Sequence, residues 1–197
     1  MDKNLAAVIE RRIECTVQAL RANNMDAFRV ADTVELYKKL DDLMNEGSTW
    51  SVGGSMTLFE AGVIDYLKKG PYTYFDRYAE GADLDDVYAK AQRCDVYFCS
   101  SNAITEDGKL YNVDGRGNRI SNLIFGPKRV MVIAGYNKIV KDIEAARQRA
   151  DQIASPANAE RLNVKDYKTI CSHELVSQQQ VAKGRITVLI LAEQYGY

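Results

Sequence analysis

Residues 49–60 read TWSVGGSMTLFE, and this stretch decides the fold class. An apolar run ends at two glycines, a serine follows, and a helical pattern then begins, which is typical of a strand that leads through a tight turn into a helix. We expect the strand over Thr49–Val52 and the N-cap of the helix at Ser55. The helix should end at Lys68–Pro71, and its buried face should hold Phe59, Val63, Tyr66 and Leu67.

The same alternation of strand and helix continues along the chain. The spacing of apolar residues predicts helices over residues 3–22, 32–47, 84–91, 118–125 and 139–153. It predicts further strands over residues 27–31, 72–75, 95–99, 110–113, 130–134 and 185–193. Parallel neighbours need a helical crossover, so the pattern predicts an α/β protein with a mostly parallel sheet and helices on both faces. We expect one domain over residues 1–197, with the helix over 1–22 packed on its core.

Composition and charge exclude several classes of protein. The formal net charge is −1, whereas proteins that bind nucleic acid backbones need a clustered positive excess, so we expect no nucleic-acid partner. No run of about 18 apolar residues is present, so we expect no membrane partner. The first ten residues lack the apolar core of a signal peptide, which indicates a cytoplasmic location. The four cysteines form no CxxC pair, and we expect them to be reduced.

The loop between the first quoted strand and its helix is the first candidate site. Gly53 and Gly54 would let a ligand approach the backbone closely, and Ser55, Met56 and Thr57 would present amide hydrogens at the start of the helix. Such a site favours a phosphate, a carboxylate or a pyrophosphate. The spacing matches neither the dinucleotide-binding GxGxxG nor the P-loop pattern. A tight turn that binds nothing is the alternative, and Glu60 in the helix is either a general base or a solvated side chain.

A long polar stretch over residues 100–122 is the second candidate site. Amides and glycines there provide the candidate ligand-binding residues Asn102, Asn112, Gly115 and Asn118. The carboxylates Glu106, Asp107 and Asp114 could serve as acid, base or nucleophile, with Glu106 and Asp114 the stronger catalytic candidates. Alternatively, each of these carboxylates stabilises a turn or caps a helix.

The only histidine does not indicate a metal centre. His173 stands two residues after Cys171, and two ligands without further ones at a suitable spacing are too few for a metal site. We therefore predict no metal, and the sequence leaves any cofactor open.

Taken together, these stretches resemble the LUD domain, the family of the lactate-utilization protein C. The resemblance rests on residues 51–58, 112–119, 124–127, 135–140 and 184–186. It implies a three-layer fold like that of ribose-5-phosphate isomerase and the CoA transferases, and it adds Lys138 to the ligand-binding residues. In that wider group a Gly-rich loop binds phosphate or an acyl carrier and a polar turn supplies carboxylates. The resemblance also implies a role in lactate or related organic-acid utilization, an iron–sulfur redox partner and a homodimer.

The sequence departs from the family pattern at two places. Relatives often carry Gly-Ala-Asp where this chain has Ser101-Asn102-Ala103, so an amide replaces an expected acid. Of a cysteine cluster before the last strand, only Cys171 remains.

Three functions stay open. The first is binding of a small anionic metabolite with a phosphate-, carboxylate- or CoA-like group, in organic-acid metabolism. The second is a carboxylate-dependent transferase or hydrolase of the CoA-transferase type. The third is a non-catalytic subunit that docks an iron–sulfur protein. Whether the chain is an enzyme is therefore undecided by the sequence.

Overall fold

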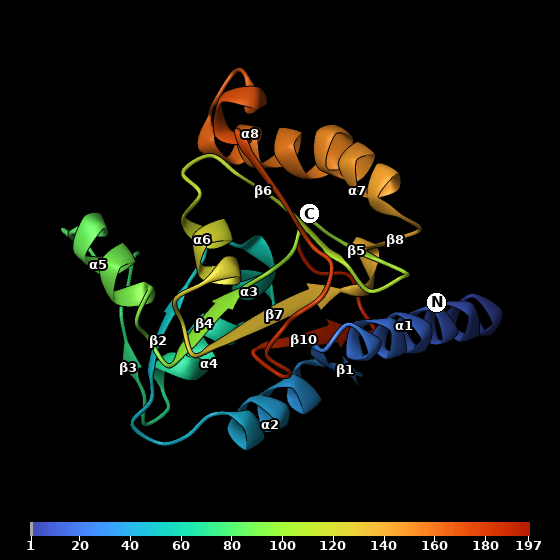
Figure 1. The fold of residues 1–197 in the computed structure, drawn as a ribbon, viewed down its shortest axis with the longest axis horizontal. Helices are drawn as coiled ribbons and strands as arrows, with labels where there is room; N and C mark the ends of the chain where they lie inside the picture. The colour runs from blue at the N-terminus through green and yellow to red at the C-terminus, as the bar shows by residue number, and fades with distance from the viewer. Residues whose placement is uncertain (1) are drawn as a thin grey trace.

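The core of the molecule is a six-stranded parallel sheet, seen in a computed structural model that describes residues 2–197, apart from the side chain of residue 169 (Figure 1). Every neighbouring pair of strands in this sheet is parallel, as the alternation of strands and helices predicts. The strands, in their order across the sheet, are β1 (Asp26–Val30), β10 (Ile186–Leu191), β7 (Arg129–Gly135), β4 (Val96–Cys99), β2 (Thr49–Val52) and β3 (Thr73–Tyr74).

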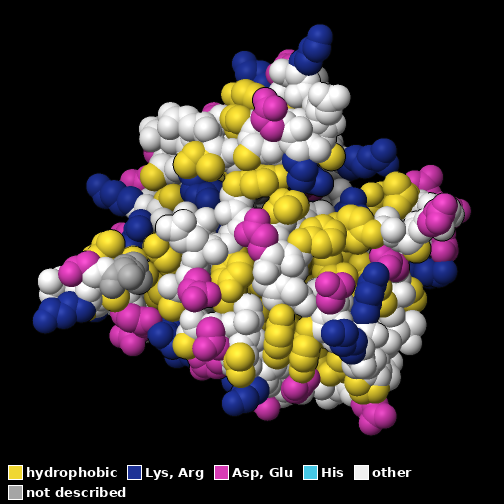
Figure 2. Space-filling model, turned by 180° about the vertical axis from the view of Figure 1, so that it is seen from behind, with side chains coloured by type: hydrophobic (Ala, Val, Ile, Leu, Met, Phe, Trp, Pro, Cys, Tyr) yellow, Lys and Arg dark blue, Asp and Glu magenta, His cyan; other side chains and the backbone are white. Residues whose placement is uncertain are grey.

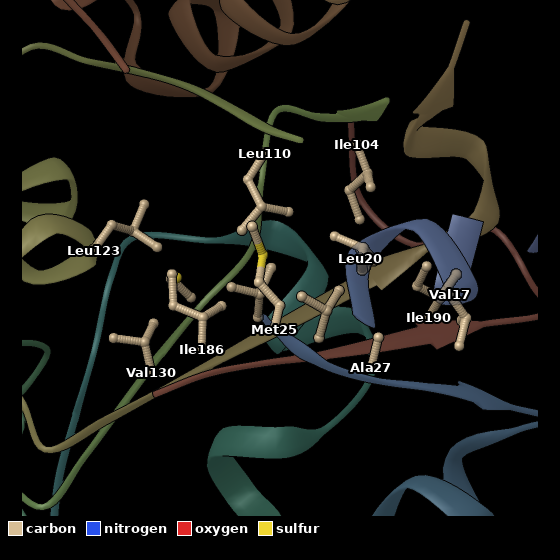
Figure 3. Close-up of a cluster of buried hydrophobic side chains, with 14 of the residues drawn as sticks. Val17, Leu20, Met25, Ala27, Ile104, Leu110, Leu123, Val130, Ile186 and Ile190 are labelled. Carbon is tan, nitrogen blue, oxygen red and sulfur yellow. The ribbon is translucent and has the colours of Figure 1, made fainter. Parts of the chain in front are cut away.

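Helices cover both faces of the sheet, which gives three layers. On one face lie α1 (Lys3–Ala22), α5 (Leu84–Ala91) and α6 (Asn118–Ile124), each of which contributes to one apolar cluster. Figure 3 shows this cluster, in which Val17 and Leu20 of α1 lie beside Ile190 of β10. On the other face lie α2 (Thr33–Leu43), α3 (Met56–Glu60) and α4 (Val63–Lys68), packed around the fully buried Trp50. The α/β class is thus confirmed.

A second, smaller sheet was not expected from the sequence. It consists of β8 (Ile139–Val140), β5 (Ala103–Thr105), β6 (Leu110–Asp114) and β9 (His173–Ser177), in that order. Only β6 matches a predicted strand. The short antiparallel pair of β5 and β6 closes over Gly108, which lies against the end of α1. Much of the polar stretch over residues 100–122 thus belongs to β5, β6 and the turn between them.

The long helix predicted over residues 139–153 is wrong at its start. Ile139 and Val140 instead pair with β5, and α7 (Ile143–Arg149) begins after the N-cap Asp142, whose carboxylate accepts the amide hydrogen of Ala145. The helical path then continues through a π-helical turn, Ala150–Ala154, into α8 (Ser155–Leu162), and a 3₁₀ helix follows at Tyr167–Ile170.

The helix predicted from Ser55 onward is divided in two at Gly62. This glycine has φ of +63°, in the left-handed region, and a Cβ there would lie 2.6 Å from the hydroxyl of Tyr37. That hydroxyl donates a hydrogen bond to the carbonyl oxygen of Ala61. α3 is therefore only five residues long. Among the described helices, none has the length and apolar character needed to cross a membrane.

Candidate functional site

A cavity of about 490 Å³ lies at the carboxyl ends of the strands of the larger sheet. Four of its lining residues follow such strands: Gly54 after β2, Ser100 after β4, Lys138 after β7 and Tyr197 after β10. These strands are parallel, so their carboxyl ends meet at one edge of the sheet. The topology alone brings together residues that are far apart in the sequence.

Three helices and their turns surround this edge. α6 contributes Asn118 and Arg119, α5 contributes Leu84 and Tyr88, and α8 contributes Asn158, Arg161 and Leu162. In Figure 1, α5 lies to the left of α6 and α8 lies above it. The cavity is therefore walled by segments from most of the chain.

The glycine-rich loop forms one wall of the cavity. Gly54, Ser55 and Met56 line the cavity, whereas Gly53 and Thr57 lie behind them. A Cβ at Gly53 would lie 3.0 Å from the hydroxyl of Tyr97, so a side chain there would require Tyr97 to shift. The Ser55 hydroxyl accepts the amide hydrogen of Leu58 at 3.4 Å. Because α3 is so short, its dipole contributes little positive potential.

Lys138 lines the cavity and is almost fully buried, with 3% of its surface exposed. Its Nζ donates to Oγ1 of Thr57 at 2.8 Å and to Oγ of Ser100 at 3.1 Å. Burial, together with the nearby positive charges of Arg149 and Arg119, lowers the pKa of this amine from 10.5 to about 7. Near neutral pH, Lys138 therefore exists as both amine and ammonium.

Asp114 and Arg119 form a buried ion pair in the lining of the cavity. Oδ1 of Asp114 accepts from Nε of Arg119 at 2.9 Å, and Oδ2 accepts the amide hydrogens of Arg119 and Ile120. The guanidinium also donates to Oδ1 of Asn102 and to the carbonyl oxygens of Ser100 and Val113. Both side chains are thus committed to holding the start of α6 and the turn after β4.

Three further arginines line the cavity and pair with no carboxylate among the described residues. Arg77 donates to the hydroxyl of Tyr88 and lies over the rings of Tyr78 and Tyr88. Arg161 donates to Tyr197 and Asn158, and Arg116 is exposed. Within the described lining, Asp114 has the only side-chain carboxylate, and Arg119 neutralises it. The cavity therefore carries a net positive charge, although acidic and basic side chains mix on the molecular face in Figure 2.

The last residues of the chain cross the edge of the sheet beside Thr57. Tyr195 accepts the Thr57 hydroxyl at 3.3 Å through its carbonyl oxygen, and its amide donates to Asn137. Gly196 donates its amide hydrogen to Glu60 at 2.6 Å. This segment covers part of the start of α3, and the Tyr197 side chain lines the cavity.

The structure separates the candidate carboxylates. Glu106 is exposed and forms an ion pair with Arg12 of α1 at 2.6 Å, away from the cavity lining. Glu60 is exposed beside the last residues of the chain, and its charge reaches Lys138. Asp114 is the one that lines the cavity, and both of its oxygens are occupied. A catalytic role for these residues stays a prediction.

The candidate ligand-binding residues come together more closely. Gly54, Ser55, Met56, Asn102, Gly115, Asn118 and Lys138 all line the cavity. Asn112 does not, although its buried amide has no hydrogen-bond partner among the described residues. Cys171 also lines the cavity, donating to Ser155 at 3.0 Å. Within the described chain, no group of three His, Cys, Asp or Glu side chains could hold a metal ion.

Sequence reasoning missed the arginines as a set. Arg77, Arg116, Arg119 and Arg161 lie in three separate segments, and neither Arg77 nor Arg161 belongs to a recognisable motif. One signal was available: Arg116 and Arg119 both lie in the glycine-rich stretch over residues 114–119, and a simple turn does not require two arginines.

The family model of the LUD domain matches residues 13–191 of this chain. The chain belongs to the LUD-domain family. A solved structure described as a DUF162 family protein from Deinococcus radiodurans covers 94% of this LUD-domain protein and 97% of its own length, with 12% identity and a TM-score of 0.53. That similarity supports the same fold. Ribose 5-phosphate isomerase from Plasmodium falciparum also matches, with 14% identity over 55% of this chain and 52% of its own, and a TM-score of 0.29. No protein with a curated description matches this LUD-domain protein.

Proposed function

We propose that this LUD-domain protein binds a small anionic metabolite of organic-acid metabolism, of the lactate-utilization kind, in the cavity at the carboxyl edge of the larger sheet. One observation carries the proposal: three arginines without carboxylate partners and the buried Lys138 converge on one cavity. A guanidinium group can donate two parallel hydrogen bonds to the oxygens of a carboxylate or phosphate. The arginines would therefore hold the charged group of the ligand.

The size and the walls of the cavity limit the class of ligand. A volume of about 490 Å³ lies within the range of small-molecule sites, and tyrosine rings and polar side chains share its lining. The hydroxyls and amides of Ser55, Asn102 and Asn118 can orient polar groups of the ligand. We therefore expect a carboxylate or phosphate compound rather than an apolar one.

The test is calorimetric titration with lactate, pyruvate, acetyl-CoA and inorganic phosphate, for the wild type and for Gly54→Asp. A Cβ at Gly54 would lie 3.8 Å from Nη1 of Arg77, which is ordinary contact, and the backbone there is not in the left-handed region. The new carboxylate would neutralise Arg77 inside the cavity. We expect binding about tenfold or more weaker, with an unchanged unfolding temperature.

Two control variants separate charge from shape. Gly54→Ala adds the same Cβ without charge and should bind nearly as the wild type does. Arg93→Gln removes a positive charge from an exposed arginine outside the cavity and should also leave binding unchanged. Equal affinity of Gly54→Asp and Gly54→Ala for every anion, or no binding by the wild type, would contradict the proposal.

The other two functions lack a supporting contact. Glutamyl transfer would need a carboxylate free to react in the cavity, but Glu106 is paired with Arg12 and Asp114 with Arg119. Docking of an iron–sulfur partner and homodimer formation stay predictions from the family resemblance.

A further inference from the structure

We infer that Lys138 is a nucleophile that forms an imine with the carbonyl group of an anionic aldehyde or ketone held in the cavity. The inference rests on the proposed function, because the arginines would hold the anionic group while Lys138 meets the carbonyl carbon. It is carried by the two hydrogen bonds that hold the Lys138 amine, by its place in the cavity lining and by the hydroxyl of Ser100 beside it.

The hydrogen bonds around Nζ leave one position of the nitrogen free. The single proton of the Thr57 hydroxyl goes to the carbonyl oxygen of Tyr195, so Oγ1 of Thr57 accepts from Lys138. Oγ of Ser100 accepts the second N–H. A neutral amine has two hydrogens, and both are used here, so its lone pair is not engaged by either hydroxyl. Lys138 lines the cavity, which is where an electrophile would reach this lone pair.

Ser100 completes the arrangement. Its hydroxyl accepts from Lys138, and in this arrangement its own proton makes no hydrogen bond to another described residue. Ser100 is buried and lines the cavity, so this proton is available to a carbonyl oxygen beside Nζ. A hydrogen bond to that oxygen would make the carbonyl carbon more electrophilic.

The protonation state of Lys138 favours attack at neutral pH. A pKa of about 7 instead of 10.5 gives Lys138 a neutral fraction about a thousand times that of an ordinary lysine at pH 7. In general, a lysine amine that is protonated has no lone pair to offer and is not a nucleophile.

The reaction balances without a further reactant. The Nζ lone pair attacks the carbonyl carbon, and one amine proton passes to the oxygen to give a carbinolamine. The oxygen then takes one proton from solvent and leaves as water, while the nitrogen lone pair forms the C=N bond of a protonated imine. Electrostatic attraction between the protonated imine and the anionic group of the ligand, which the arginines hold, would stabilise the adduct.

The experiment is reductive trapping at pH 7 followed by peptide mass mapping. The full chain is incubated with pyruvate or with dihydroxyacetone phosphate and then with sodium cyanoborohydride, which reduces an imine to a stable secondary amine. The two probes distinguish a carboxylate from a phosphate as the anionic group. We expect the reduced adduct at Lys138 with at least one probe, at a rate about a hundredfold or more above that at other lysines.

Matched variants test the assignment. Lys138→Arg keeps the charge and should lose the adduct, whereas Lys141→Arg changes an exposed lysine three residues away and should retain it. Ser100→Ala should slow trapping about tenfold or more, because it removes the hydrogen bond to the carbonyl oxygen. Circular dichroism checks that each variant folds, and Lys138→Met replaces Lys138→Arg if the guanidinium does not fit.

The outcomes separate this inference from the proposed function. Anion binding by calorimetry without an adduct at Lys138, or an adduct spread evenly over the lysines, would overturn the imine and leave the proposed function intact. Absence of both binding and adduct would overturn both. An adduct confined to Lys138 that is lost in Lys138→Arg and kept in Lys141→Arg supports both.

Discussion

Lys138 links the stability of the protein to pH. Its pKa is about 7 in the folded protein and near 10.5 in the unfolded chain, so between these values the unfolded state binds more protons. The wild type should therefore gain stability as the pH rises from about 7 toward 10, and the full cost of burying the charge should be present below pH 7.

We predict that Lys138→Met removes this dependence. Each pKa unit corresponds to about 1.4 kcal/mol, so the free energy of unfolding of the wild type, relative to that of Lys138→Met, should rise by about 2 to 3 kcal/mol between pH 6 and pH 9. Urea unfolding followed by the fluorescence of the buried Trp50 measures it. Lys141→Met is the control and should show no such change. A constant difference at all pH values would contradict the assigned pKa.

We predict that Asp114 contributes strongly to the stability of the folded protein. In Asp114→Asn, an amide NH₂ must face either the guanidinium of Arg119 or the backbone amides of Arg119 and Ile120, all of which are donors. We expect a loss of about 3 kcal/mol in the free energy of unfolding, since one partner of a buried pair is removed. Asp86→Asn, in an exposed pair with Lys90, should cost less than about 1 kcal/mol. Chemical denaturation compares them, and equal losses would refute this role.

At the scale of elements, the turn between β5 and β6 fixes the smaller sheet to α1. Gly108 has φ of +81°, and a Cβ there would lie 2.4 Å from the carbonyl carbon of Ala19. Asn23, at the end of α1, donates to the carbonyl oxygens of Asp107 and Gly108. Both observations place this turn directly on the backbone of the helix.

We predict that Gly108→Ala destabilises the protein by about 3 kcal/mol or more, because the turn must move away from α1. Gly81→Ala is a matched control: Gly81 has φ of +70°, but nothing lies within 4 Å of its Cβ position, so only the cost of the left-handed backbone, about 1 kcal/mol, remains. Thermal unfolding of both variants gives the comparison. A similar loss in both would show that the contact with Ala19 is unimportant.

The sequence predicted elements well where local signals were strong. The cap at Asp32, the glycine-rich loop and the apolar runs over residues 130–134 and 188–191 give the helices and buried strands that the structure contains. The second sheet could not be predicted, because β5, β8 and β9 are short and exist through pairing with distant partners. The division at Gly62 depends on Tyr37, a residue 25 positions away, which no local pattern reveals.

At the scale of the whole molecule, the site is a product of topology. Local sequence patterns indicate the glycines and amides of the cavity, because these residues lie in recognisable loops. They do not indicate Arg77 and Arg161, which approach the cavity from α5's preceding loop and from α8. Guanidinium groups in separate segments have no common spacing, and only the order of the parallel strands brings them together.

A bound anion should therefore stabilise the whole chain. The cavity lining comes from segments between residues 54 and 197, so the cavity exists only in the folded protein. A ligand that binds the folded state and not the unfolded state raises the unfolding temperature. At a concentration one hundred times its Kd, a ligand should add about 2.7 kcal/mol to the free energy of unfolding. Differential scanning calorimetry should show one transition that moves as a unit. Splitting of the transition on binding would contradict this expectation.

The meeting of parallel strand ends at one edge also bears on how this site comes into being as the chain folds. Its walls are joined by contacts between residues that are remote in sequence, so closing them costs loop entropy before any of them is complete. A fragment of the chain would lack part of these walls. Affinity for the proposed anionic ligand should therefore emerge late and in a single step during refolding. It should appear together with the burial of Trp50 against α2, α3 and α4.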